Sequence, residues 1–151
     1  MTKIKRTTPD NPDFVQLVKE LDAYLKVTDG AEHDFYHQFN GITSLQYVVV
    51  AYVNDQAVGC GALKEFNTDT LEIKRMYLKL ANRRSGIATE ILNALEVWAK
   101  ELGYLKTVLE TGTRQVEALK FYHKSGYHRI PNYAPYAHME NSNCFEKNLQ
   151  K

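Results

Sequence analysis

The chain has few cysteines, no excess of charge and no long apolar run. Two cysteines in 151 residues exclude a disulfide framework, so we expect a hydrophobic core to hold the fold and both thiols, Cys60 and Cys144, to be reduced. A formal net charge of +1 gives no basic surface for nucleic acid. No stretch approaches the roughly 20 apolar residues that span a bilayer, and no signal-peptide pattern is present. We therefore expect a cytoplasmic protein with neither nucleic-acid nor membrane partners.

Metal sites and multiple domains are also not expected. The five histidines never combine with the cysteines at metal-ligand spacing, so no metal is expected. Hydrophobic residues make up 44% and charged residues 25%, which is ordinary for a globular protein. No repeat, low-complexity segment or linker interrupts the sequence. The length suits one hydrophobic core, so we expect a single domain over residues 1–151.

Periodicity predicts alternating strands and helices. Stretches rich in β-branched and aromatic residues, bounded by turn residues, predict strands at 4–7, 47–53, 57–63, 71–78, 106–111, 127–130 and 143–147. Apolar residues at helical spacing predict helices with stripes over 14–25, 32–39, 87–102 and 116–124. Gly103 is a natural stop for the third of these helices, and Trp98 on its stripe is expected in the core.

The strand at 71–78 is irregular. Its apolar residues begin at alternate positions, Leu71 and Ile73, but then occupy three successive positions from Met76 to Leu78. Strand side chains alternate between the two faces of a sheet, so a lost alternation indicates a bulge or a change of environment.

A basic loop with glycine, Arg83-Arg84-Ser85-Gly86-Ile87-Ala88, follows that strand and opens the long helix. A helix start presents unpaired N–H groups and a partial positive charge, which favour an anion such as a phosphate. The loop lacks the Gly-Lys-Ser/Thr ending of a P-loop and the three-glycine spacing of a dinucleotide fold. On charge alone, an arginine pair that merely caps a core helix remains an equal alternative.

These residues resemble the GNAT (general control-related) N-acetyltransferases. The loop 83–88 matches the acetyl-CoA signature of that family, Arg/Gln-x-x-Gly-x-Gly/Ala. The preceding Glu72-Ile73-Lys74-Arg75-Met76-Tyr77 looks like its central strand. Further along this chain, the second half of the family's pattern is matched by similar residues: Leu109-Glu110-Thr111-Gly112, Ala118, Phe121-Tyr122 and Ser125-Gly126-Tyr127. The similarity covers roughly residues 47–130.

The resemblance implies an α+β fold of three layers. A mixed, mostly antiparallel sheet of six to seven strands would split in the middle to hold the cofactor, and about four helices would flank it. Acetyl-CoA would be the co-substrate, with no metal. Backbone groups of Met76, Tyr77 and Leu78 would pair with its pantetheine arm. Its pyrophosphate would be held by amides of Arg84, Ser85, Gly86, Ile87 and Ala88, with charge from Arg83 and Arg84.

The resemblance also implies direct attack of a neutral amine on the thioester in a ternary complex. Tyr122 would protonate the departing thiolate, since a phenol with a pKa of about 10 is protonated at neutral pH. Packing beside Phe121 is the alternative role for Tyr122. Glu72 is the first choice for the base that deprotonates the amine, and Glu110 is the second.

The acceptor site is expected from the early helices and the late loop. These offer carboxylates and rings that suit a primary amine, on a small molecule or an exposed amino group, and the resemblance adds a homodimer as an expectation. The residues concerned are Asp29, Glu32, His33, Asp34, Phe35, Tyr36, Tyr133 and Tyr136. The alternative function is a non-catalytic module, on the same fold, that binds acyl-CoA or a protein partner.

Overall fold

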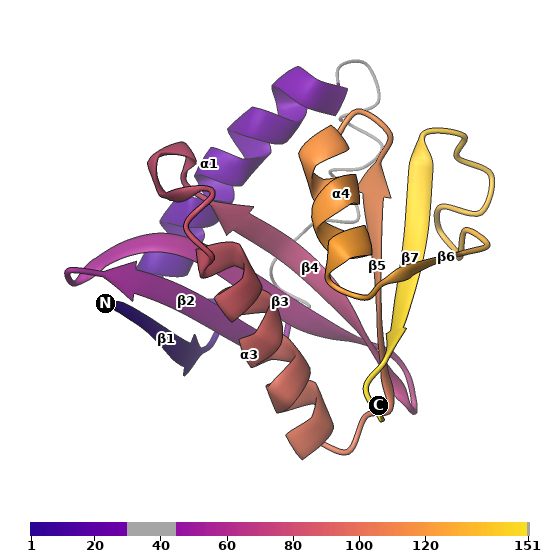
Figure 1. Cartoon of the computed structure of the whole chain (residues 1–151), viewed down its shortest axis with the longest axis horizontal. Coiled ribbons are helices and arrows are strands. Elements are labelled where there is room, and N and C mark those ends of the chain that lie inside the picture. The colour runs from indigo at the N-terminus through magenta and orange to yellow at the C-terminus, as the bar shows by residue number, and fades with distance from the viewer. Residues whose placement is uncertain (30–44, 151) are drawn as a thin grey trace.

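The computed structural model describes residues 1–29 and 45–150, which form seven strands, three α-helices and one 3-10 helix (Figure 1). In chain order these are β1 (Thr2–Thr7), α1 (Pro12–Asp29), β2 (Tyr47–Val53), β3 (Gln56–Asn67), β4 (Thr70–Leu78), the 3-10 helix η2 (Leu80–Asn82), α3 (Ile87–Glu101), β5 (Lys106–Gly112), α4 (Val116–Lys124), β6 (His128–Ile130) and β7 (Ser142–Asn148). The helix expected at 32–39 lies outside the described residues.

The seven strands form one sheet in the order β1-β2-β3-β4-β5-β7-β6. Every pair is antiparallel except β4 with β5, which is parallel. This mixed, mostly antiparallel sheet with helices on both faces confirms the expected α+β class. The strand boundaries differ from the expected ones by a few residues, most at the end of β3, which continues to Asn67.

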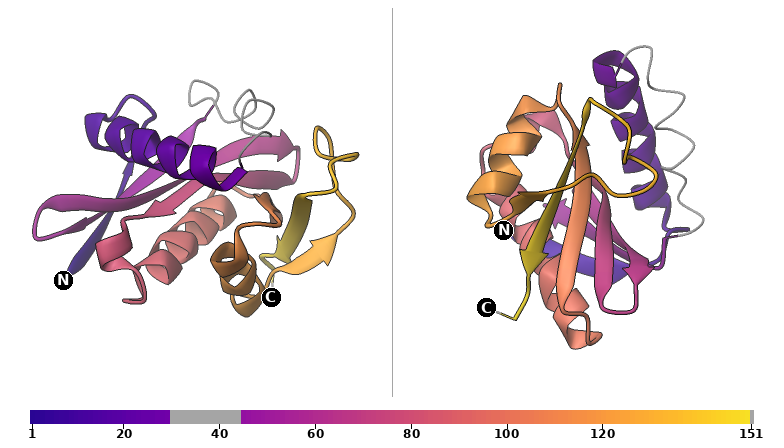
Figure 2. Two further views of the ribbon diagram at one scale, coloured as in Figure 1. Left: turned by 90° about the horizontal axis from the view of Figure 1, so that it is seen from above. Right: turned by 90° about the vertical axis from the view of Figure 1, so that its right-hand side faces the viewer.

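Helices cover both faces of the sheet, with α1 on one side and α3 and α4 on the other (Figure 2). Because strand side chains alternate, Val48 and Val50 pack under α1 with Phe14, while Val49 packs on the opposite side with Ile91 of α3. Burial of both faces explains why residues 47–53 are apolar almost throughout.

The expected bulge in β4 is present. The pairing of β4 with β3 jumps from Ala62 opposite Lys74 to Cys60 opposite Tyr77, so Arg75 and Met76 together face one residue of β3. Arg75 has a φ of 59°. Lys74 and Tyr77 consequently point to the side covered by α1, since their partners belong to the apolar cluster under that helix.

The sheet splits between β4 and β5, as expected. The two strands pair only over Thr70–Glu72 and Lys106–Val108, and beyond this point they diverge (Figure 1). The edge of β4 that faces β5 therefore has no partner among the described strands over residues 73–78. A backbone edge of this kind can pair with an extended ligand.

The helix ends follow the chemistry of their capping residues. The Asn11 side chain accepts a hydrogen bond from the Asp13 amide at 2.8 Å and caps α1. Gly103, with a φ of 92°, follows the end of α3, as expected. Trp98 is only half-buried, which corrects its expected core position, because it lies at the edge of α3 under the Arg6 guanidinium.

Both cysteines are free and buried. Within residues 1–29 and 45–150, no helix has the length and apolar content needed to cross a membrane.

Candidate active site

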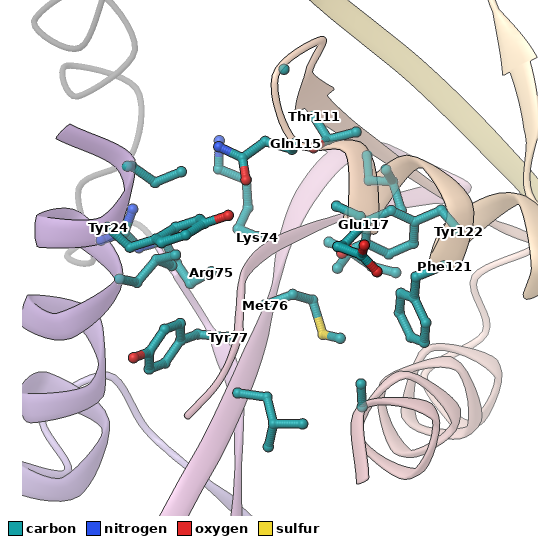
Figure 3. Close-up of a pocket in the computed structure, with 18 of the residues that line it drawn as sticks. Tyr24, Lys74, Arg75, Met76, Tyr77, Thr111, Gln115, Glu117, Phe121 and Tyr122 are labelled. Carbon is teal, nitrogen blue, oxygen red and sulfur yellow. The ribbon is translucent and has the colours of Figure 1, made fainter. Parts of the chain in front are cut away.

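A cavity of about 580 Å³ lies along the split in the sheet. It is lined by the bulged half of β4, by α1, by the loop before α3, by the end of β5 and by α4 (Figure 3). Most of the residues singled out from the sequence line it: Glu72, Met76, Tyr77, Leu78, Arg83, Arg84, Ala88 and Tyr122. Ser85, Gly86 and Ile87 are not among its lining residues but complete the loop between Arg84 and Ala88.

The loop before α3 has the backbone geometry of an anion site. Arg84 and Gly86 both adopt left-handed conformations, with φ of 65° and 86°. Such alternation turns successive amides toward one concavity. Gly86 precedes α3 and makes no side-chain capping hydrogen bond, so the first amides of the helix, which have no partner within the helix, are not capped by that residue. A Cβ at Gly86 would meet no atom within 4 Å, so the left-handed φ is what favours glycine there.

The two arginines of this loop behave differently. Arg83 donates from Nε to the Leu78 carbonyl at 2.9 Å, and its guanidinium lies 5.6 Å from the centre of the Tyr24 ring. Arg83 therefore ties the end of β4 to α1. Arg84 is exposed and leaves its charge at the rim of the cavity.

Tyr122 is both packed and open to the cavity. Its side chain is 7% exposed, and its ring lies beside Phe121 and Tyr127, with centroids 5.1 and 5.8 Å away. Its hydroxyl has no hydrogen-bond partner within the described residues. Burial raises the pKa of Tyr122 above its ordinary value, so the phenol keeps its proton at working pH.

Glu72 is buried and held in place. Its carboxylate accepts a hydrogen bond from the Tyr133 hydroxyl at 2.9 Å, and the Lys74 ammonium lies 4.0 Å away. Glu110 also lines the cavity. It lies on the same side of the sheet, because Val108 is the partner of Glu72 and Glu110 is two residues further along β5.

The sequence interpretation assigned no role to two buried cations on β4. The Lys74 ammonium lies 3.4 Å from the Tyr136 hydroxyl, and Arg75 pairs with Asp22 of α1 at 2.6 Å. Burial lowers the pKa of Lys74, while the neighbouring carboxylates of Glu72 and Glu110 oppose that shift. A sequence signal could have revealed them. Glu72, Lys74 and Arg75 are charged, yet they lie in a strand whose other residues are mostly apolar and expected to be buried.

A buried donor without a partner also lines the cavity. The side-chain nitrogen of Gln115 is buried and makes no hydrogen bond to any described residue. A buried donor left unpaired costs roughly 1–3 kcal/mol, so an acceptor on a bound ligand would stabilise it. Gln115 precedes α4, but its side chain makes no hydrogen bond that would cap this helix.

The residues expected for the acceptor are placed only in part. Glu32, His33, Asp34, Phe35 and Tyr36, together with the side chain of Asp29, lie outside what the structure describes. Tyr133 packs edge-on against Phe66, with ring centroids 4.7 Å apart, and its hydroxyl is committed to Glu72. Tyr136 is buried against Cys144.

Across the described ranges, no group of three or more His, Cys, Asp or Glu side chains is placed to hold a metal ion.

Comparison with known families identifies this arrangement. The model of the acetyltransferase (GNAT) family matches residues 14–127. The chain belongs to this family. Membership implies acyl-CoA-dependent acetyl transfer and explains why the sheet splits beside a loop that can hold an anion.

Two curated GNAT relatives match over much of their length. An IAA acetyltransferase from Azospirillum brasilense is 30% identical over 141 residues, which cover 88% of each chain. The uncharacterised N-acetyltransferase YsnE of Bacillus subtilis is 35% identical over 101 residues, 66% of this chain and 67% of the relative.

Solved GNAT structures share the fold over nearly the whole chain. A protein from Klebsiella pneumoniae, provisionally named an acyl-CoA N-acyltransferase, superposes with a TM-score of 0.83 at 27% identity, covering 99% and 98% of the two chains. A GNAT acetyltransferase from Elizabethkingia anophelis, solved with acetyl-CoA, has a TM-score of 0.71 at 21% identity, covering 97% of each chain. PaiA N-acetyltransferase from Thermoplasma acidophilum, solved with coenzyme A, has a TM-score of 0.73 at 18% identity, covering 98% and 99%.

Proposed function

We propose that this protein is an N-acetyltransferase that moves the acetyl group of acetyl-CoA to a primary amine, by direct attack in a ternary complex. The observation that carries this proposal is one continuous cavity in which an anion-binding loop, an unpaired strand edge, a buried phenol and a buried carboxylate meet. Each supplies one function that the reaction needs.

The residues present fit acetyl-CoA as co-substrate. The amides from Arg84 to Ala88 would hold the pyrophosphate, and the unpaired edge at Met76, Tyr77 and Leu78 would pair with the amides of the pantetheine arm. Gln115 would donate to an acceptor on the same ligand, which satisfies its buried nitrogen. The Leu78 carbonyl is already bound by Arg83, so at that residue we assign the pairing to the amide.

The reaction requires two proton transfers by groups of the chain. The bound thioester supplies an activated acyl carbon. This carbon forms a bond to the acceptor nitrogen as its bond to sulfur breaks. We assign to Glu72 the removal of a proton from the acceptor ammonium, directly or through water. Tyr122 gives its phenolic proton to the departing sulfur. The second proton, which the nitrogen loses as the amide forms, passes to solvent, and Tyr122 regains its own proton from solvent.

Exchange of Glu72 for glutamine is expected to lower kcat/KM about 100-fold at neutral pH, the lower end of what a positioned base contributes. The loss should shrink as the pH rises toward the pKa of the acceptor amine, because an amine that is already neutral needs no base. Thiol release measured across pH tests this, with Glu110→Gln as the matched control. A larger, pH-dependent loss in the Glu110 variant would move the role to Glu110.

The cofactor assignment is tested by calorimetric titration with acetyl-CoA of the unmodified protein and of Gly86→Glu. We expect the variant to lose affinity about 30-fold or more, because a carboxylate would face the pyrophosphate. Gly103→Glu is the control: it has the same left-handed backbone and open surroundings at the other end of α3, outside the cavity.

If the two glycine variants bind acetyl-CoA with equal affinity, the loop is not part of the binding site. Failure of the folded, unmodified protein to bind millimolar acetyl-CoA would overturn the transferase proposal and favour a protein-interaction module. Binding without turnover of any amine would favour a non-catalytic acyl-CoA-binding module.

We further propose that the enzyme acts in the cytoplasm, and a homodimer remains an expectation from the family.

A further inference from the structure

Lys74 is buried beside the cavity with few partners for its charge. Its side chain is 7% exposed, the Tyr136 hydroxyl lies at a long 3.4 Å, and the closest carboxylate oxygen, on Glu72, lies at 4.0 Å. An ammonium group has three donors, and a buried charge is costly unless those donors are satisfied. Among the described residues, Lys74 therefore has unused capacity for an acceptor atom.

The neighbouring charges are better satisfied than Lys74. Glu72 accepts from Tyr133 at 2.9 Å, and Arg75 is bound to Asp22 at 2.6 Å, although its buried Nε has no partner within the described residues. Among the described residues, the unmet side-chain groups on β4 are thus N–H donors rather than oxygens. Donors without acceptors favour a ligand that brings oxygen atoms.

Lys74 lies away from the loop that would hold the pyrophosphate. It points to the side of the sheet covered by α1, whereas Arg84 to Ala88 open α3 on the other side. Both places border the same cavity, and Figure 3 shows Lys74 extending into the space between α1 and α4. An oxygen-bearing ligand at Lys74 would therefore be a part of the acceptor rather than the pyrophosphate of the co-substrate.

The same side of the sheet also carries negative charge. Glu72 and Glu110 border the cavity near Lys74 and suit the ammonium form of an acceptor. A site with both signs within a short distance is poorly matched to a simple amine, which would leave the Lys74 donors unmet. It is better matched to a molecule that carries both charges.

Resting on the proposed function, we propose that the acceptor is a small zwitterion, an amine that also carries a carboxylate. The carboxylate binds the Lys74 ammonium, with the Arg75 Nε as a second donor, and the amine lies toward Glu72 and Glu110. Lys74 then determines acceptor specificity and takes no part in the chemical step. A purely structural Lys74, which only balances Glu72, would affect all acceptors alike.

The test compares each acceptor with its own carboxamide. The probes are the α-amino acids, β-alanine and 4-aminobutyrate, each paired with the amide that lacks the negative charge, and turnover is followed by thiol release. We expect at least one carboxylate to exceed its amide about tenfold or more in kcat/KM, as one charge-assisted hydrogen bond allows. Lys74→Met should lower that ratio to near one, and Lys74→Arg should retain part of it.

Lys79→Met is the control variant. Lys79 lies just beyond the end of β4, pairs with Glu20 at 3.5 Å and does not line the cavity, so its loss should leave the ratio unchanged. Thermal melting and acetyl-CoA titration of each variant verify folding and co-substrate binding.

The outcomes separate this inference from the proposed function. Absence of acetyl-CoA binding overturns the proposed function. Three results would overturn the zwitterionic acceptor but not the proposed function. The first is turnover of the amides as fast as of the carboxylates, and the second is an equal loss of turnover for both in Lys74→Met. The third is no turnover of any probe by protein that binds acetyl-CoA.

Discussion

Replacement of Tyr122 by phenylalanine is expected to lower kcat by about 100-fold to 10,000-fold, the range that a positioned acid contributes. Tyr122 lines the cavity, and the change removes only its hydroxyl and leaves the ring beside Phe121 and Tyr127. Because that hydroxyl has no hydrogen-bond partner in the described part of the chain, the stability of the fold should hardly change. Affinity for acetyl-CoA should stay within about threefold, because the phenol acts on the departing sulfur.

The matched control is Tyr127→Phe. Tyr127 is buried next to Tyr122 but does not line the cavity, and its hydroxyl is hydrogen-bonded to Thr107 at 2.7 Å and to Glu96 at 2.9 Å. Its loss should lower the free energy of unfolding by about 1–3 kcal/mol, since buried partners are left unpaired, and should largely spare turnover. A reversed pattern, with turnover lost in Tyr127→Phe alone, would contradict the role of Tyr122 as the acid.

The pH dependence gives a second check on Tyr122. A tyrosine with an ordinary pKa of about 10 would lose its proton at the alkaline end of a rate profile. Burial raises the pKa of Tyr122, so kcat should show no fall near pH 10 that depends on this residue. A decline near pH 10 that disappears in Tyr122→Phe would show that the phenol is more exposed to solvent than the structure indicates.

The exchange of Asp22 for asparagine is expected to lower the free energy of unfolding by about 3 kcal/mol, as for other buried ion pairs broken from one side. Arg75 is only 2% exposed, and its partner Asp22, at 2.6 Å, is 29% exposed. Without that carboxylate, the guanidinium stays buried with its charge uncompensated. Urea denaturation at neutral pH followed by circular dichroism measures the change.

A similarly short but exposed ion pair provides the control. Arg6 and Glu101 lie 2.8 Å apart, yet their side chains are 44% and 53% exposed, so Glu101→Gln should scarcely move the denaturation midpoint. Equal shifts in the two variants would show that burial of the Arg75 pair adds nothing to stability. Because Arg75 sits in the bulge of β4, the loss of its Asp22 partner should also disturb the cavity and raise KM for the acceptor.

The sequence indicates local structure well because the causes are local. The loop at 83–88, the stop at Gly103 and the disturbed alternation after Ile73 each depend on neighbours a few residues away, and the described structure contains all three. The mixed sheet followed from the family resemblance. The roles given to Tyr122 and Glu72 stay predictions, although both residues line the cavity.

The sequence could not show which distant groups meet. Tyr133 and Glu72 are 61 residues apart, and Arg75 and Asp22 are 53 apart. No period or motif encodes these pairs, because each arises from how the late loop and α1 pack on β4. The same packing decides that Lys74 points inward, whereas a lysine in a strand is more often on the surface.

The short seam between β4 and β5 has a mechanical consequence. The sheet consists of two leaves, β1–β4 and β5–β7. Within the described residues, strand pairing joins them only at Thr70–Glu72 and Lys106–Val108. A joint at one end lets small rotations there become larger displacements at the far end, where Leu78 and Gly112 border the cavity. The backbone bonds from Leu105 and Lys106 to Asp69, at 2.8 and 3.3 Å, secure this joint. A change at this turn, which does not line the cavity, is therefore expected to alter the width of the cavity.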